Sequence, residues 1–494
     1  MNTFKRKALT CAVLAGLGAV ATTAEAVYKN PDNTGQVLIY PYYTVQAGFS
    51  TYVTIVNTTS AAKALKIRFR EGKTSAEVED HNIFLSPNDM YVAVITASGP
   101  NATDPARINA VGDTSCTLPN FGASGFFDFR NIIYSVSPDS LPQSDTSLDR
   151  TREGYIEVFD MVTLTGADAT AVTHVVPGAP PGCPATVFVP AAPLLPPTGG
   201  LTGTVTLINT VTGADMGYTA DALDAFTTLA VFNGTGNLGP ALTDATPPVS
   251  LVLANGSAYQ DTWGPGTAPV QAGSRAVAAV FMHSSVSNEY ILDANTASNT
   301  DWVLTFPGKR DFFNGISSRN PFSNNITTAG ACEPSLFSFW NRDENTGSTT
   351  SISPAGTPPN TPPLCFESTV VSIRNGGPTN ATGSVSGVLG SINTVAVSLP
   401  SSSFSNGWAR ITFTGARSQS PAGGLNSVAG QRLPMVGAVV AGAHTFVGLP
   451  VTGFMARSFK NATLPCTTTA GGATTCSVLF ESNFAHGYRT IILP

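Results

Sequence analysis

The chain has 494 residues, enough for roughly two to four domains. Only 11% of the residues are charged while 42% are hydrophobic, so the chain lacks the highly charged, apolar-poor composition of a disordered protein. The formal net charge of −6 argues against nucleic acid as a partner, because nucleic-acid-binding proteins carry a basic surface.

A secretory signal peptide is predicted at residues 1–26. Basic residues occupy positions 5–7, an uncharged apolar run follows over Ala8–Val20, and the small residues at 24 and 26 fit a cleavage site. The apolar run is shorter than the roughly 20 residues that a membrane-spanning helix needs, and an N-terminal membrane anchor is the alternative. We therefore expect an exported protein, either extracellular or on the outer cell surface, with the periplasm as a further location.

Cysteine usage agrees with export. Six of the seven cysteines follow the signal peptide: Cys116, Cys183, Cys332, Cys365, Cys466 and Cys476. An even number in an exported chain favours disulfide bonds. The simplest pairing joins neighbours, namely 116 with 183, 332 with 365 and 466 with 476, although the spacing leaves other connectivities open. No C-x-x-C motif occurs, so a zinc site is the weaker interpretation.

The first half of the mature chain is rich in predicted strands. In Ala64–Arg70, apolar side chains alternate with Lys66, Arg68 and Arg70, which predicts one buried and one wet face. Short strands separated by turn residues are typical of a sandwich. Predicted strands in this half cover residues 36–45, 51–57, 64–70, 81–85, 90–96, 155–164, 201–209, 227–232, 276–283 and 301–306.

The second half continues this pattern, and helix signals are scarce apart from one or two turns at 220–226. Further strands are predicted at 335–340, 368–374, 408–414, 436–440, 446–449 and 476–481. The predicted fold class is all-β, with two or more Ig-like β-sandwich domains, long loops and disulfides.

The predicted domain organisation has three parts after the signal peptide. An N-terminal β-sandwich region covers 27–310 and carries a Pro-rich insertion near 177–200, a linker or loop covers 311–334, and a C-terminal sandwich covers 335–494. In the alternative organisation, the regions before and after the linker interlock by exchanging strands. The uncharged segment Leu433–Ala456 is interrupted by prolines and glycines, so we expect buried strands there and no transmembrane span in the mature chain.

No catalytic, cofactor-binding or metal-binding residue is predicted. The five histidines show no metal-ligand spacing, and no G-x-S-x-G motif occurs. Asn341–Gly347 is faintly similar to a calcium loop but lacks the closing Glu, so a hairpin turn is favoured.

Two groups of carboxylates could serve a hydrolase. They are Glu77, Glu79 and Asp80 beside His81, and Glu153, Glu157 and Asp160 along one strand. Paired carboxylates cleave glycosides when they lie roughly 5–10 Å apart. The favoured interpretation places them on wet strand faces, opposed by Arg68, Arg70 and Lys73.

Aromatic residues suggest a glycan surface. Tyr40, Tyr42 and Tyr43 form the densest aromatic group and are the candidate binding surface. The four tryptophans at 263, 302, 340 and 408 are scattered singly and are interpreted as core anchors.

Several segments resemble a group of exported proteobacterial cell-surface proteins of unassigned function. They include IYPYYTV at 39–45, KIRFREGK at 66–73, REGYIEVFDM at 152–161 and TDWVLTFPGKR at 300–310. The resemblance implies export and a β-rich fold, and it brings no activity or site residue.

These observations favour an exported structural or adhesive protein without catalysis, such as a surface-layer, filament or matrix subunit. The expected partners are further copies of the chain or other cell-surface components, and a glycan is a further candidate. Residues Val27–Gly35 could pair with the sheet edge of a neighbouring subunit. The alternatives are a secreted polysaccharide or ester hydrolase that uses Glu153 and Glu157, and an extracellular carbohydrate-binding protein.

Overall fold

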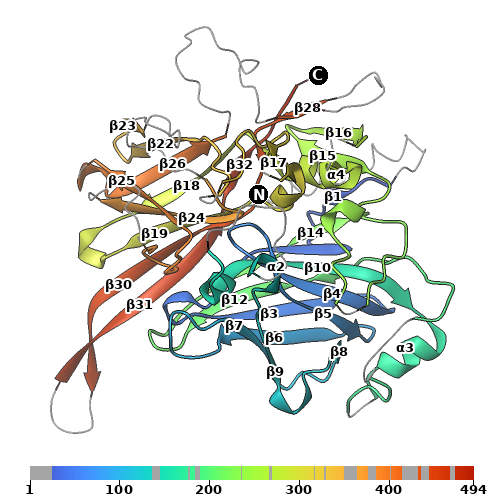
Figure 1. The fold of residues 1–494 in the computed structure, drawn as a ribbon. Helices are drawn as coiled ribbons and strands as arrows, with labels where there is room; N and C mark the ends of the chain where they lie inside the picture. Colours follow the sequence, from blue (N-terminus) through green and yellow to red (C-terminus); the bar gives the residue numbers. More distant parts are fainter. Residues whose placement is uncertain are drawn as a thin grey trace, which may run out of the picture.

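The structure is a computed structural model in which mostly antiparallel strands form four large sheets (Figure 1). It describes residues 25–135, 145–175, 178–183, 190–234, 236–265, 270–315, 317–327, 330–349, 364–375, 385–400, 402–413, 432–434, 444–467 and 473–493. The predicted all-β class with several sandwiches and disulfides is confirmed. Residues 1–24 of the predicted signal peptide and the predicted strand at 436–440 lie outside the described residues.

The first sandwich consists of two seven-stranded sheets. Sheet 1 has the order β1 (Tyr28–Lys29), β14 (Asp221–Asp224), β2 (Val37–Thr44), β10 (Glu153–Leu164), β4 (Ala62–Glu71), β5 (Glu77–Leu85) and β8 (Cys116–Leu118). Sheet 2 has the order β13 (Ala214–Thr219), β12 (Thr204–Asn209), β3 (Ser50–Asn57), β6 (Met90–Ala97), β7 (Ala106–Ala110) and β9 (Phe126–Asp128), and β11 (Leu201–Thr202) also pairs with β3.

Sheets 1 and 2 bury a common core between them. The predicted alternation in β4 places Leu65, Ile67 and Phe69 in this core, together with Ile55 of β3 and Ile95 of β6. All five side chains are fully buried, and burial of each contributes about 1.5–3 kcal/mol to folding. The period of two in the sequence therefore orients β4 correctly.

The second sandwich consists of two five-stranded sheets. Sheet 3 has the order β23 (Thr346–Thr349), β22 (Leu336–Asn341), β26 (Asn406–Thr412), β18 (Ser285–Ile291) and β32 (Gly487–Arg489). Sheet 4 has the order β25 (Thr394–Leu399), β24 (Ser368–Asn375), β19 (Asn299–Thr305), β30 (Phe454–Thr467) and β31 (Ala473–Ala485). The pairing of β24 with β25 is parallel.

Smaller elements surround the sandwiches. The short strand groups are β15 (Val249–Ala254) with β16 (Ser257–Thr262), β17 (Met282–His283) with β29 (Leu449–Pro450), β20 (Phe313–Asn314) with β21 (Ser317–Ser318), and β27 (Arg432–Pro434) with β28 (Thr445–Val447) and β33 (Ile491–Leu493). The α-helices are α2 (Ile132–Ser135), α3 (Gly166–Val172) and α4 (Ala272–Phe281). Short 3-10 turns include η3 (Leu148–Arg152), η4 (Leu242–Asp244) and η6 (Lys309–Phe312).

The two sandwiches contact each other directly. The backbone N–H of Ser368 donates to the carbonyl of Gly72 at 2.8 Å, and the hydroxyl of Thr305 donates to the carbonyl of Pro41 at 2.6 Å. Strands β18 and β19 precede residues 311–334, yet they pair with β26, β24 and β30, which follow that segment. The segment therefore does not divide the sheets of the second sandwich, which combine strands from both sides of it.

Three local predictions are wrong. Residues 272–281 form helix α4 instead of the predicted strand at 276–283, because a helix that is buried on nearly all sides shows the same apolar run as a buried strand. Residues 221–224 form strand β14 instead of a helical turn, since they pair with β2. The described residues 227–232 contain no strand.

Two of the three proposed disulfides are present. Cys116 bonds to Cys183 and Cys332 bonds to Cys365. Cys466 and Cys476 lie on the paired strands β30 and β31, where Leu464 is opposite Cys476. The side chains of this third pair lie outside the described residues, so their disulfide stays a prediction.

The segment that begins at Val27 is part of the chain's own sheets. The N–H of Val27 donates to the carbonyl of Val249 at 2.7 Å, and Tyr28 is opposite Asp224 in β14. The side chain of Val27 is fully buried. The expectation that Val27–Gly35 pairs with a neighbouring subunit is therefore corrected, because residues 27–29 already have partners within the chain.

Candidate functional site

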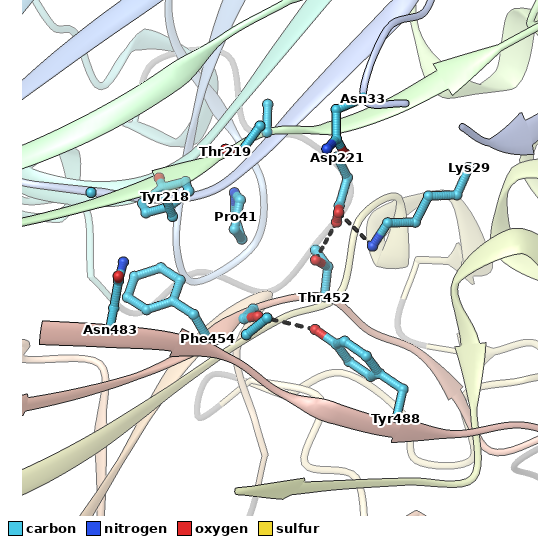
Figure 2. A pocket seen from close by; sticks show the side chains of 14 residues that line it. Lys29, Asn33, Pro41, Tyr218, Thr219, Asp221, Thr452, Phe454, Asn483 and Tyr488 are labelled. Atoms are coloured by element: carbon cyan, nitrogen blue, oxygen red, sulfur yellow. Dashed lines mark hydrogen bonds and ion pairs between the residues drawn. The ribbon is translucent and has the colours of Figure 1, made fainter. Parts of the chain in front are cut away.

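The candidate functional site is a cavity of about 350 Å³ between the two sandwiches. Figure 2 shows how the edge of the first sandwich meets sheet 4 and β32 around it. Its polar and aromatic lining includes Lys29, Asn33, Tyr218, Asp221, Asn483 and Tyr488. The sequence did not single out these residues, because they come from segments that are distant in the chain and meet only in the fold.

The charges in the cavity compensate each other. The Nζ atom of Lys29 lies 2.5 Å from a carboxylate oxygen of Asp221, and the hydroxyl of Thr452 donates to the other oxygen (Figure 2). The same Nζ lies 5.9 Å from the ring centroid of Tyr488. Since Asp221 is neutralised by its lysine, the cavity presents an ion pair and not an unpaired carboxylate.

The remaining walls are aromatic and amide. Tyr218 stacks on Phe454 with ring centroids 4.7 Å apart. The hydroxyl of Tyr488 donates to the carbonyl of Gly453 at 3.0 Å, and burial raises the pKa of this tyrosine well above its usual range. The amide nitrogen of Asn483 has no hydrogen-bond partner among the described residues. These walls suit the binding of a small polar molecule, and none of the lining groups named here is an activated nucleophile or a general base.

The two carboxylates proposed for hydrolysis are structural. One oxygen of Glu153 accepts the N–H groups of Ile392 and Asn393, both at 2.9 Å, and the other accepts the hydroxyl of Tyr42 at 2.7 Å. Glu157 accepts a bond from Arg70 at 3.1 Å. Both carboxylates are buried and their oxygens hold neighbouring chain segments, so they do not converge in an open cleft.

The expected wet faces of β4 and β5 are covered. Lys66 pairs with Asp80 at 2.7 Å and Arg68 pairs with Glu77 at 2.5 Å, so the expected opposition of charges occurs. However, Lys66 donates to the carbonyl of Gly234 and Arg68 donates to that of Pro240, which lie in a covering segment. The prediction of a wet face is therefore wrong, because residues from the 229–245 region lie over it.

The tyrosine group does not form a surface. The rings of Tyr40, Tyr42 and Tyr43 are buried in the core of the first sandwich. The hydroxyl of Tyr40 donates to the carbonyl of Thr54 at 2.7 Å, and that of Tyr43 donates to the carbonyl of Thr151 at 3.0 Å. The proposed glycan surface at these residues is therefore corrected: the three rings are core residues.

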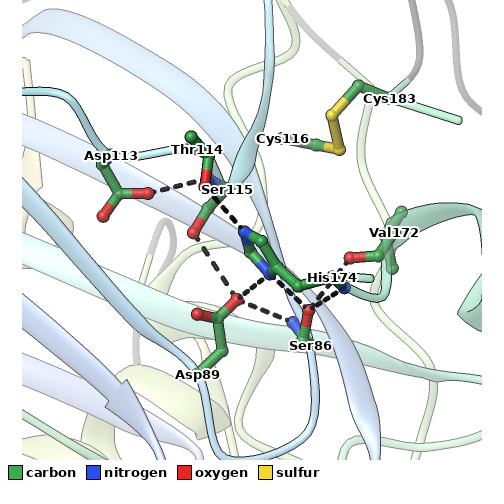
Figure 3. Close-up of a disulfide and its surroundings, with 9 residues drawn as sticks. All are labelled: Ser86, Asp89, Asp113, Thr114, Ser115, Cys116, Val172, His174 and Cys183. Atoms are coloured by element: carbon green, nitrogen blue, oxygen red, sulfur yellow. Dashed lines mark hydrogen bonds and ion pairs between the residues drawn. A yellow bond between two sulfur atoms is a disulfide. The ribbon is translucent and has the colours of Figure 1, made fainter. Parts of the chain in front are cut away.

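A serine, a histidine and an aspartate meet beside the first disulfide (Figure 3). The hydroxyl of Ser86 and the carboxylate of Asp89 both face Nδ1 of His174, at 2.7 and 3.4 Å. In a catalytic triad the hydroxyl and the carboxylate face different ring nitrogens, and here Nε2 faces Thr114 at 3.0 Å. In the adjoining loop, the backbone N–H of Ser115 donates to the carboxylate of Asp113 at 2.8 Å. The cluster therefore closes the loops around Cys116–Cys183 and lacks the geometry of a serine hydrolase.

The other histidines are also held by neighbours. Nδ1 of His444 lies 3.0 Å from Asp261, and Nε2 of His486 lies 3.0 Å from the carbonyl of Val303. Burial lowers the pKa of His283 and of His486 to about 4, so both rings are neutral near pH 7. No group of three metal-ligating side chains occurs in the described part of the chain.

The Asn341–Gly347 segment forms the predicted hairpin turn. Strands β22 and β23 pair on either side of it, and the side-chain oxygen of Asn341 accepts the N–H groups of Asp343 and Asn345. This asparagine therefore closes the turn. Over the described ranges, no helix combines the length and apolar character needed to cross a bilayer.

No family model matches this chain, and neither a curated protein nor a solved structure matches it.

Proposed function

We propose that this protein is an exported, non-catalytic structural or adhesive component of the cell surface that associates with further copies of itself. The observation that carries the proposal is the ribbon of β30 and β31, which projects from the body in Figure 1. Strand β19 pairs with β30 only at Met455–Ser458, whereas β30 and β31 pair with each other from Phe454 to Thr467. Beyond Ser458, both outer backbone edges of the described ribbon can therefore template pairing with another chain.

The body from which the ribbon projects suits a load-bearing role. Its two sandwiches share buried clusters, and two disulfides close long loops. Each of these disulfides contributes about 2–4 kcal/mol in an oxidising compartment. Glu153, Glu157 and the charges of β4 and β5 hold the fold together, which favours the structural interpretation over a hydrolase.

Cell fractionation followed by electron microscopy tests the proposal. We expect the full-length protein in an envelope or filament fraction, with ordered arrays in the micrographs. A variant without residues 1–26 is the control and should stay inside the cell. Soluble monomers found only in the culture medium would contradict the proposal.

A shortened ribbon tests the assembly step. Replacing residues 461–478 with an Asn-Gly turn leaves the pairing of β30 with β19 intact. We expect this variant to fold, to be exported and to remain monomeric by light scattering, while the parent protein assembles. Equal assembly of the two proteins would exclude the ribbon as the contact.

A further inference from the structure

The outer face of sheet 3 carries two stacked tryptophans. Trp340 of β22 lies directly opposite Trp408 of β26, and their ring centroids are 4.0 Å apart at an interplanar angle of 9°. Phe339 and Ala409, the neighbours in sequence, point into the core. The interpretation of all four tryptophans as core anchors therefore holds for Trp263 and Trp302, which are 2% and 0% exposed, and fails for Trp408, which is 37% exposed.

An arginine lies over this pair. The guanidinium carbon of Arg410 is 5.2 Å from the ring centroid of Trp408 and 5.8 Å from that of Trp340. The side chain is half-buried, and the structure gives it no carboxylate partner among the described residues. Arginine commonly stacks on aromatic rings while its N–H groups stay available for a planar acceptor such as a carboxylate.

The aromatic surface continues from sheet 3 onto the ribbon. Glu289 of β18 lies opposite Trp408, and its carboxylate is 3.5 Å from Arg457 of β30. Arg457 in turn lies 4.3 Å from the ring centroid of Phe484, which is 45% exposed. Trp340, Trp408, Arg410, Glu289, Arg457 and Phe484 together form what we call the aromatic–arginine strip.

The chemistry of the strip matches a carbohydrate chain. In the stacked pair each indole covers one face of the other and keeps one face turned away from its partner. Such a ring face suits the C–H face of a pyranose ring, and charged groups beside it can bind hydroxyl and carboxylate groups. Glu289 and Arg457 neutralise each other, so the strip has one excess positive charge, at Arg410. A single charge cannot supply the many phosphate contacts that nucleic acid requires, whereas it suffices for one acidic sugar in a chain of neutral ones.

We propose that the aromatic–arginine strip binds a polysaccharide that carries uronate sugars among neutral ones, with a neutral pyranose on the tryptophan pair and a uronate carboxylate on Arg410. The site goes beyond the proposed assembly function, because it uses side chains of sheet 3 and of the base of the ribbon, whereas the assembly contact uses the ribbon's backbone edges beyond Ser458. It also differs from the tyrosine group that the sequence suggested.

Affinity electrophoresis with three polymers tests the proposal: hyaluronan, glucuronoxylan and neutral hydroxyethylcellulose. We expect at least one of the two uronate-bearing polymers to retard the intact protein. Trp408→Ala should weaken that retention by roughly tenfold or more, and Trp408→Tyr should restore most of it. Arg410→Gln should weaken retention by the uronate-bearing polymer roughly tenfold and leave retention by the neutral polymer unchanged.

Tyr52→Ala is the matched control, since Tyr52 is 37% exposed on β3 of the other sandwich, and it should bind like the parent. Absence of retardation by both uronate-bearing polymers would overturn the proposal, as would equal retention of the parent and Trp408→Ala. Light scattering tests whether the strip binds a second copy of the chain, and a duplex DNA fragment tests whether it binds nucleic acid. A change from dimer to monomer on Trp408→Ala, or tighter binding of DNA than of polysaccharide, would also overturn it.

Discussion

The outer faces of sheet 1 and sheet 3 differ from what their side chains would suggest. Charged side chains are enclosed on sheet 1, whereas an aromatic pair lies on the outer face of sheet 3. On sheet 1, Lys66, Arg68 and Arg70 are almost fully enclosed with their acidic partners. On sheet 3, Trp408 is 37% exposed and stacks on a half-buried Trp340. Both faces are outer faces of a sandwich, and both alternate regularly with a core face.

The difference lies in what covers each face. Residues from the 229–245 region lie over sheet 1 and accept hydrogen bonds from Lys66 and Arg68, whereas no described segment makes equivalent bonds over the tryptophan pair. A buried charge needs both a counter-ion and hydrogen bonds, and the covering carbonyls supply the bonds. Side-chain chemistry alone therefore does not reveal which outer face is enclosed.

The largest expected effect comes from breaking an enclosed ion pair. Arg68→Met leaves Glu77, whose side chain is 8% exposed, without its cation, and should lower the free energy of unfolding by about 3–5 kcal/mol. Denaturant unfolding measures this loss. Arg107→Met is the control: its pair with Asp128 has side-chain exposures of 24% and 45%, so the expected loss is about 0–1 kcal/mol.

A double variant sharpens this result. Arg68→Met combined with Glu77→Leu removes both charges, and most of the lost stability should return. If Arg68→Met alone costs no more than the Arg107 control, the pair is hydrated and the covering segment does not enclose it.

A disulfide shares a hydrophobic cluster with the covering segment. Cys116 belongs to β8 at the edge of sheet 1, and its partner Cys183 packs against the same buried cluster as Val231 and Phe232. Replacing both cysteines with serine should cost about 2–4 kcal/mol and speed hydrogen exchange at residues 229–234 more than in sheet 3. Equal exchange in the two regions would show that the disulfide does not hold the cover.

A third test uses pH. Burial raises the pKa of Glu367 to about 8 and lowers the pKa of Lys309 nearby. The unfolded carboxyl ionises near its ordinary value of 4.5, so its stabilising contribution is full below that pH and is lost as the pH rises toward 8.

The expected signature is therefore a difference in slope. Glu367→Gln should remove the downward contribution of Glu367 to the unfolding free energy between pH 5 and 8, so the variant's slope should be less negative than the parent's in denaturant titrations at several pH values. Glu289→Gln is the control, since the Glu289 side chain is 67% exposed, and its slope should equal that of the parent. Equal slopes for the parent and Glu367→Gln over this range would contradict the raised pKa of Glu367.

The smallest expected effect comes from the open face. Trp408→Ala removes one stacked ring and should cost about 0.5–1.5 kcal/mol beyond the loss of its partly buried area. The near-ultraviolet circular dichroism of the coupled indoles should disappear with it. A loss as large as that of Arg68→Met would indicate that another part of the molecule covers the tryptophans.

The sequence predicted local elements best where one face is core and the other is not. Residues 51–57 and 90–96 were placed as strands with bounds close to those of β3 and β6, because alternation is strong there. The strand prediction at 276–283 failed, because a segment that is buried on nearly all sides lacks the periodic signal that separates a helix from a strand. The assumption that neighbouring cysteines pair gave two correct disulfides. Such a bond closes the loop between consecutive cysteines, so their order in the chain is enough to suggest it.

Local sequence properties established the all-β class and most strand positions, and cysteine order suggested the two observed disulfide pairs while other connectivities stayed open. The folded structure was needed to show that Tyr40, Tyr42 and Tyr43 are core residues, that Arg68 is enclosed, and that Trp408 is exposed beside a half-buried Trp340. The physical reason is that exposure depends on which distant segment lies over a face. The segment over sheet 1 is more than 150 residues away in the chain from the arginine that it covers.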